Sequence, residues 1–166
     1  QGSDTKGAPK LRLATASKDG TVKLWNANTG QVEKSLSGHT ASVTCLLWGG
    51  NDHLYSGSQD RTVRVWSASD GRLLSVLEGH GHWVNSLSLS TGYVLRTGAC
   101  NPSEQRVHHT SATSVNGQDA IEKARKRYVK ACASTQGRPR LVSCSDDFTL
   151  LIWDPEKTSK PVARLT

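Results

Sequence analysis

Short stretches in which apolar and polar residues alternate recur along the chain and predict β-strands. Val22-Lys23-Leu24 and Val63-Arg64-Val65 place an apolar side chain at every second position, which is the period of a strand with one buried face. Turn-forming residues such as Lys18-Asp19-Gly20 bound these stretches. Further apolar stretches, 42–48 and 83–89, each follow a Gly-His pair. The pattern predicts an all-β chain.

Three of these stretches are copies of one repeat. The copies are residues 13–25, 54–66 and 141–153, and each has an Asp six residues before a Trp and a Thr or Ser four residues before that Asp. The Trp residues of the first two copies are 41 residues apart, whereas those of the last two are 87 apart. The third copy therefore carries an insertion of about 46 residues.

The repeat resembles the WD40 repeat, a four-stranded propeller blade of about 40–45 residues with Gly-His and Trp-Asp landmarks. Gly38-His39 and Gly79-His80 supply the first landmark, and Trp153-Asp154 supplies the second. The resemblance covers roughly residues 11–99 and 141–166. It implies an all-β WD40 β-propeller fragment of about three blades, with one helical insertion in the third.

In WD40 proteins a His, a Ser or Thr, an Asp and a Trp form a hydrogen-bonded network inside each blade. The resemblance implies two complete networks here, and a third whose His would precede residue 1. Buried polar atoms persist only when they are paired, so these residues are assigned a structural role. The implied members are Thr15, Asp19 and Trp25 in the first blade, His39, Ser56, Asp60 and Trp66 in the second, and His80, Ser143, Asp147 and Trp153 in the third.

The spacing of the copies predicts the domain boundaries. Residues 1–10 are interpreted as a leader or a cloning remnant. We expect a partial blade over 11–37, a complete blade over 38–78, and a blade over 79–166 that carries a basic helical insertion at about 100–140. Because propellers close with about 4–8 blades, we expect the chain to be a piece of a larger ring.

The insertion holds most of the positive charge. The chain has a net charge of +7, and residues 100–140 contribute +5 of it. Residues 119–133 predict a helix in which Asp119 caps the first turn, with Glu122 three residues later. An apolar stripe is expected to lean on the propeller, and a basic stripe is expected to face solvent. The apolar stripe is Ile121, Ala124, Tyr128 and Cys132, and the basic stripe is Lys123, Lys126, Arg127 and Lys130.

Three interpretations of this basic helix stay open. An outward basic stripe can hold phosphates by charge pairing and counterion release. A basic helix is also a common form of solvated surface, and residues 123–130 have the composition of a nuclear-localisation sequence. The candidate residues for binding rRNA or a partner are Lys123, Arg125, Lys126, Arg127 and Lys130.

Several segments, taken together, are more specific than a general WD40 sequence and resemble the Notchless family. These are Gln59–Thr62, Gly79–Asn85, Leu87–Thr91, Arg96–Ala99, Ser145–Thr149 and Lys160-Pro161, together with the insertion. Members of this family are nuclear and nucleolar factors with an N-terminal ubiquitin-like domain and an eight-bladed propeller. The resemblance implies a non-catalytic scaffold that docks on pre-60S ribosomal particles through protein and rRNA contacts. The family's N-terminal domain binds a midasin-type AAA ATPase, and no residue of this sequence is assigned to that contact.

A general protein-interaction propeller is the alternative, as a substrate adaptor in ubiquitin ligation or a signalling scaffold, including a Notch-pathway role. The turns beside each network Asp are expected to lie on one rim of the propeller. Trp83 is interpreted either as an exposed anchor there or as a side chain half-buried between blades. The candidate protein-binding residues of this rim are Arg61, His82, Trp83 and Phe148.

No pattern in the sequence favours a catalytic, cofactor or metal site. The Ser-His-Asp combination recurs at the spacing of the blades with a Trp attached, and it lacks the G-x-S-x-G turn of a hydrolase nucleophile. Cys100, His108, His109 and Cys132 lack the close spacing of structural zinc ligands. No apolar run reaches the roughly 18 residues of a membrane helix. We therefore expect no catalytic residue, metal, cofactor, small-molecule substrate or membrane partner.

Overall fold

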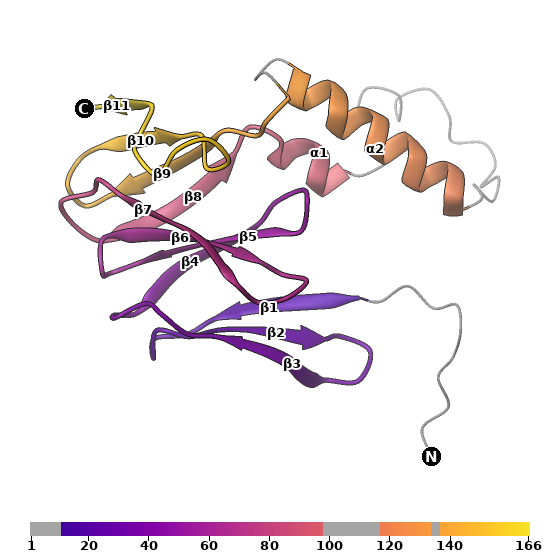
Figure 1. The fold of residues 1–166 in the computed structure, drawn as a ribbon, viewed down its shortest axis with the longest axis horizontal. Coiled ribbons are helices and arrows are strands. Elements are labelled where there is room, and N and C mark those ends of the chain that lie inside the picture. Colours follow the sequence, from indigo (N-terminus) through magenta and orange to yellow (C-terminus); the bar gives the residue numbers. More distant parts are fainter. Residues whose placement is uncertain (1–10, 98–116, 134–136) are drawn as a thin grey trace, which may run out of the picture.

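The computed structural model describes residues 11–97, 117–133 and 137–166 (Figure 1). Within these residues the strands form three antiparallel sheets. The first sheet is β1 (Arg12–Ala16), β2 (Val22–Asn26) and β3 (Gln31–Leu36). The second is β4 (Val43–Trp48), β5 (His53–Ser58), β6 (Thr62–Ser67) and β7 (Leu73–Glu78). The third is β8 (Val84–Leu89), β9 (Leu141–Ser145), β10 (Leu150–Trp153) and β11 (Ala163–Leu165).

Each sheet is a meander in which strands that follow one another in the sequence pair side by side. The three sheets lie one above the other in Figure 1 and pack face against face. Strand β4 contacts both β1 and β8, so the first strand of the second sheet lies between its two neighbours. We call the sheets blades 1, 2 and 3. The all-β arrangement predicted from the alternating pattern is confirmed.

The hydrophobic core has two parts, one on each face of blade 2. Leu54 and Tyr55 are neighbours on β5 and are both fully buried, but they belong to different parts. Successive side chains of a strand point to opposite faces, so β5 supplies one residue to each contact between blades. The part between blades 1 and 2 also holds Trp66, and the part between blades 2 and 3 holds Trp153.

The network residues of blade 2 form a continuous chain of hydrogen bonds. His39 Nδ1 lies 2.7 Å from Asp60 Oδ2, and His39 Nε2 lies 2.8 Å from Ser56 Oγ. The Trp66 indole N–H donates to the same Ser56 oxygen at 2.8 Å. Because a carboxylate only accepts, the imidazole donates from Nδ1 to Asp60 and accepts from the Ser56 hydroxyl at Nε2. The side-chain nitrogens of His39 and Trp66 and the Ser56 hydroxyl are thereby all paired within this buried network.

Blade 3 repeats this arrangement across its insertion. His80 Nδ1 lies 3.1 Å from Asp147 Oδ2, and His80 Nε2 lies 2.7 Å from Ser143 Oγ. The Trp153 indole N–H donates to Ser143 Oγ at 2.8 Å. The network thus joins residues that are 63 positions apart in the sequence.

A threonine two residues after the network Asp belongs to each network and was not predicted. Thr62 donates its backbone N–H and its hydroxyl to Asp60 Oδ1 at 3.0 and 2.7 Å. Thr149 does the same for Asp147 at 2.9 and 2.6 Å. The signal was present in the sequence, because a Thr occupies this position in all three copies.

Blade 1 contains the remaining predicted network residues. The Trp25 indole N–H donates to Thr15 Oγ1 at 2.8 Å. Asp19 accepts from the Thr21 backbone and hydroxyl at 2.9 and 2.7 Å in an exposed turn. Among the described residues, no His contacts Asp19.

The acid–base properties of the networks follow from burial and hydrogen bonding. Burial lowers the pKa of His39, since the charged imidazolium would lose its hydration, and this outweighs the pull of Asp60. Burial by itself would raise the pKa of Asp60, but hydrogen bonds from Thr62 and His39 hold that pKa below its ordinary value. The same balance lowers the pKa of Asp147. The blade 2 network therefore combines a neutral His39 with an ionised Asp60.

Two helices, α1 (Gly92–Thr97) and α2 (Gly117–Ala133), lie between β8 and β9. The insertion predicted between the first two strands of the third unit is therefore present, although α1 was not anticipated. The predicted cap is wrong: α2 begins two residues before Asp119, which lies inside the first turn. A carboxylate there still interacts favourably with the helix dipole. None of the described helices is long and apolar enough to cross a membrane.

The two predicted stripes of α2 are only partly correct. Cys132 is buried and Tyr128 is half-buried, but Ile121 is 70% exposed. Figure 1 gives the reason, because the N-terminal half of α2 extends beyond the sheets. Arg127, expected to face solvent, is half-buried. Residues 1–10, Cys100, His108 and His109 lie outside the described residues.

Replacing Asp60 with Ala should destabilise the protein by about 1–3 kcal/mol, because it leaves buried His39 and Thr62 donors without an acceptor. Asp19→Ala is the matched control, since Asp19 occupies the same repeat position without a His. Chemical denaturation of both variants would measure the difference. Equal losses of unfolding free energy in the two variants would contradict the role assigned to the network.

The melting temperature should fall in two stages as pH decreases. Below about pH 6.5 the unfolded chain protonates His39 while the folded chain does not, so the free energy of unfolding declines. Asp60 and Asp147 stabilise the fold while ionised, and their contribution is lost as pH falls from about 4 through their lowered pKa values. Circular-dichroism melts from pH 8 to pH 3 would test this. A melting temperature that stays level down to pH 4 would argue against a neutral, buried His39.

Candidate functional site

Two candidate surfaces lie at opposite ends of blade 3. Val84 pairs with Ser145 at one end of the β8–β9 ladder, and Leu89 pairs with Leu141 at the other. The helical insertion connects Leu89 to Leu141, so it emerges at the second end. The turn that follows Ser145 and the residues that precede Val84 form the first end.

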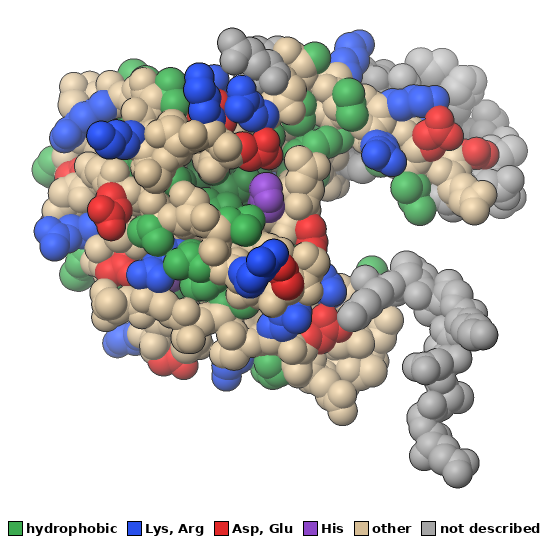
Figure 2. Space-filling view, viewed as in Figure 1, with side chains coloured by type: hydrophobic (Ala, Val, Ile, Leu, Met, Phe, Trp, Pro, Cys, Tyr) green, Lys and Arg blue, Asp and Glu red, His purple; other side chains and the backbone are tan. Residues whose placement is uncertain are grey.

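The first surface is formed by the exposed cations of α2, three lysines on one side of the helix and Arg125 on the other. The helix carries five Lys or Arg residues and two carboxylates, and Figure 2 shows the basic side chains along it with the acidic ones nearer its first turn. Lys126 forms an ion pair with Glu122 one helical turn away at 2.8 Å, and both side chains are exposed. Arg127 is half-buried and is left out of this surface. The α2 basic surface is Lys123, Arg125, Lys126 and Lys130, all of them exposed.

Apolar side chains interrupt this surface. Ile121 and Val129 are 70% and 61% exposed. They lie four residues to either side of Arg125, so the three share one side of the helix. A surface that mixes cations with exposed aliphatic groups can contact a polyanion or a protein.

The α2 helix is attached to the blades through Tyr128. A Cβ atom at Gly50 would lie 2.2 Å from the Tyr128 ring, so the ring rests directly on the backbone of the β4–β5 turn. Val94 and Leu95 of α1 and Ala124 of α2 line a hollow around the same contact. Burial raises the pKa of the Tyr128 hydroxyl. The contact holds the C-terminal half of the helix in place while the other half projects.

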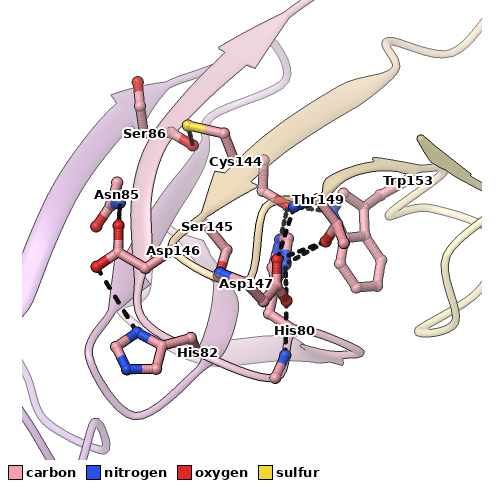
Figure 3. Close-up of polar contacts among 12 residues, drawn as sticks. His80, His82, Asn85, Ser86, Cys144, Ser145, Asp146, Asp147, Thr149 and Trp153 are labelled. Carbon is pink, nitrogen blue, oxygen red and sulfur yellow. Dashed lines mark hydrogen bonds and ion pairs between the residues drawn. The ribbon is translucent and has the colours of Figure 1, made fainter. Parts of the chain in front are cut away.

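The second surface, which we call the blade 3 rim, is His82, Trp83, Asn85 and Asp146; Figure 3 shows His82, Asn85 and Asp146. The His82 and Trp83 rings are tilted at 42° with their centres 5.1 Å apart. His82 Nδ1 lies 3.6 Å from Asp146 Oδ2, and the Asn85 amide donates to Asp146 Oδ1. The Asp146 backbone N–H donates to the Trp83 carbonyl at 3.2 Å. Trp83 is 44% exposed, so it is a partly buried side chain that still presents a face to solvent.

Arg61 and Phe148, the other predicted rim residues, occupy equivalent positions directly after a network Asp. Both adopt left-handed backbone angles, with φ of 70° and 61°. Blade 1 has Gly20 at this position, and a Cβ there would lie only 2.9 Å from the His39 carbonyl oxygen. Arg61 is exposed, and Phe148 is 93% exposed. A non-glycine residue in this conformation costs roughly 1–2 kcal/mol.

The buried networks themselves offer no accessible chemistry. Ser56 and Ser143 are fully buried, and their hydroxyls are held between a His and a Trp. Cys45 and Cys144 are half-buried on β4 and β9, and burial raises the pKa of the Cys45 thiol. In the part of the chain that the structure describes, no three His, Cys, Asp or Glu side chains are grouped for metal binding.

The chain is similar to proteins from flies and fungi. It is 43% identical over 155 residues to "Protein Notchless" of Drosophila melanogaster, covering 93% of this chain. It is 45% identical over 163 residues to "Ribosome assembly protein 4" of Saccharomyces cerevisiae, covering 97%, and 49% identical over 157 residues to that of Chaetomium thermophilum, covering 93%. These matches confirm the predicted resemblance. The chain spans 29–31% of the length of these relatives.

The repeat itself is matched by a family model described as "WD domain, G-beta repeat". The matches cover residues 8–26, 30–67 and 121–154, which together exceed half of the chain. Each match contains the Asp-to-Trp segment of one copy of the repeat, and the second match runs from β3 to the end of β6. The predicted propeller fragment is confirmed, and the chain belongs to the WD40-repeat family.

Proposed function

We propose that this chain is part of a non-catalytic scaffold that acts in assembly of the large ribosomal subunit, in the nucleus and nucleolus. The observation that carries the proposal is similarity over 93–97% of the chain to proteins named Notchless and Ribosome assembly protein 4. The repeated buried networks support a scaffold, because their reactive side chains serve packing.

The α2 basic surface is the proposed contact with rRNA in a pre-60S particle. Its four cations are exposed on a helix whose N-terminal half extends beyond the blades, so a phosphate backbone can approach that half without meeting the sheets. Each phosphate neutralised by Lys or Arg releases condensed counterions, which favours binding at low salt. Ribosomal proteins of the particle are the proposed protein contacts. Binding to a midasin-type AAA ATPase is proposed for a part of the longer protein outside this chain.

A general protein-interaction propeller is the second candidate, as a ubiquitin-ligase adaptor or a signalling scaffold, including one in the Notch pathway. Exposed Ile121 and Val129 favour it, because aliphatic groups contribute little to phosphate binding. The two proposed functions differ in how strongly binding should depend on salt concentration and on the positive charge of α2.

Changing Lys123, Arg125, Lys126 and Lys130 together to Gln should weaken binding to a 20-base-pair RNA duplex. The slope of log K against log salt should become shallower by about 0.9 per lost phosphate contact. Fluorescence anisotropy across a salt series measures this. The matched control removes the same charge from the blades by changing Lys18, Lys157, Lys160 and Arg164 to Gln. An equal loss in both variants would mean that net charge alone binds RNA.

In cells, the tagged protein should sediment with pre-60S particles, and the α2 variant should shift toward the top of a sucrose gradient. Gly50→Val provides a second variant, because it displaces Tyr128 without altering any charge. If binding to the particle depends on the position of α2, Gly50→Val should also shift partly toward the top of the gradient. Absence of the parent protein from pre-60S fractions would favour the general interaction propeller.

A further inference from the structure

Blades 2 and 3 present the same backbone at the rim but different side chains. The Gln59 N–H donates to the Ser42 carbonyl at 2.9 Å, and the Asp146 N–H donates to the Trp83 carbonyl at 3.2 Å. Trp83 and Asp146 therefore stand where blade 2 has Ser42 and Gln59. Since blade 2 forms its network with neutral, non-aromatic residues at these positions, folding does not require the aromatic ring or the carboxylate.

The two turns also differ in charge. The turn of blade 2 contains Asp60 followed by Arg61, so its formal charges cancel. The turn of blade 3 contains Asp146 and Asp147 followed by uncharged Phe148. Asp147 is engaged by the buried network, whereas the Asp146 side chain is 47% exposed. A local negative charge thus faces solvent on a chain whose net charge is +7.

The blade 3 rim is held in place before any partner arrives. His82 and Asn85 approach the two oxygens of the Asp146 carboxylate from either side. The His82 ring also lies against the Trp83 indole, so His82 links the indole to the carboxylate. Groups that are already ordered lose little conformational entropy on binding.

We propose that the blade 3 rim binds a cationic side chain, Arg or Lys, of a protein partner. The face of an indole attracts a cation, and an adjacent carboxylate adds an ion pair. The same carboxylate repels phosphate, so a protein is favoured over RNA at this end of the blade. The proposal does not depend on the α2 surface, and the two can fail separately.

Titration with N-acetyl-arginine amide, followed through the indole N–H signals of the full chain by NMR, tests this proposal. The Trp83 signal, identified by its loss in Trp83→Ser, should shift and saturate. N-acetyl-citrulline amide, a neutral near-isostere, should bind several-fold more weakly. Asp146→Gln should weaken arginine binding about two- to fivefold and leave citrulline unchanged. Both substitutions install blade 2 residues, so the fold tolerates them.

Asp70→Asn is the matched control, because it removes another exposed carboxylate from a turn outside the blade 3 rim, and it should leave arginine binding unchanged. Equal binding of arginine and citrulline amides would overturn the proposal, as would the absence of any Trp83 shift. A Trp83 shift produced by an eight-residue oligouridine but not by arginine would instead assign the rim to base stacking.

Discussion

A single buried hydroxyl group joins the parts of each blade. Ser56 and Ser143 accept from a Trp indole and bond to a His imidazole, and the His in turn reaches an ionised Asp. The His precedes the first strand of its blade and the Trp ends the third, so the hydrogen bonds tie segments that the backbone ladder does not connect. An unpaired member would leave a polar atom without water or partner, which is costly in a tightly packed interior. The stability of blades 2 and 3 therefore depends on every polar member of the network having a hydrogen-bond partner.

The same network explains why blade 3 tolerates so long an insertion. His80 and Ser143 meet although 63 positions separate them, because the insertion leaves and re-enters the sheet at the opposite end of β8 and β9. Lengthening a loop adds only slowly to the entropy cost of closing it. A chain can therefore gain helices at the Leu89–Leu141 end while the hydrogen bonds at the other end stay unchanged.

The features that could be predicted from the sequence are those that repeat. Alternation and the Asp-to-Trp spacing gave the strands of all three blades, because each copy must bury the same faces. Features that occur only once in the chain were harder to predict. The apolar stripe of α2 correctly predicted that Cys132 is buried, but it wrongly predicted that Ile121 is buried too. An amphipathic pattern does not state how far the surface beneath the helix extends. How far Trp83 is exposed depends on the turn that follows Ser145. The Trp83 carbonyl accepts a hydrogen bond from the backbone N–H of Asp146 in that turn.

Repeat architecture also separates structural residues from candidates for recognition. Thr62 and Thr149 have the same role in two blades, and their identity is explained by packing. Arg61 and Phe148 share a left-handed backbone position that blade 1 fills with glycine, yet their side chains have nothing in common. The repeat therefore fixes the backbone conformation at this position but not the identity of the side chain.

The register of β8 with β9 gives blade 3 the properties of a spacer. Six residues of strand, roughly 20 Å at 3.3 Å each, separate the end that carries α2 from the end that carries Trp83. Ligands at the two ends would not collide, and the hydrogen-bonded ladder between them cannot shorten. A complex bound at both ends would hold its two components at a fixed separation, and each attachment would raise the effective concentration for the other.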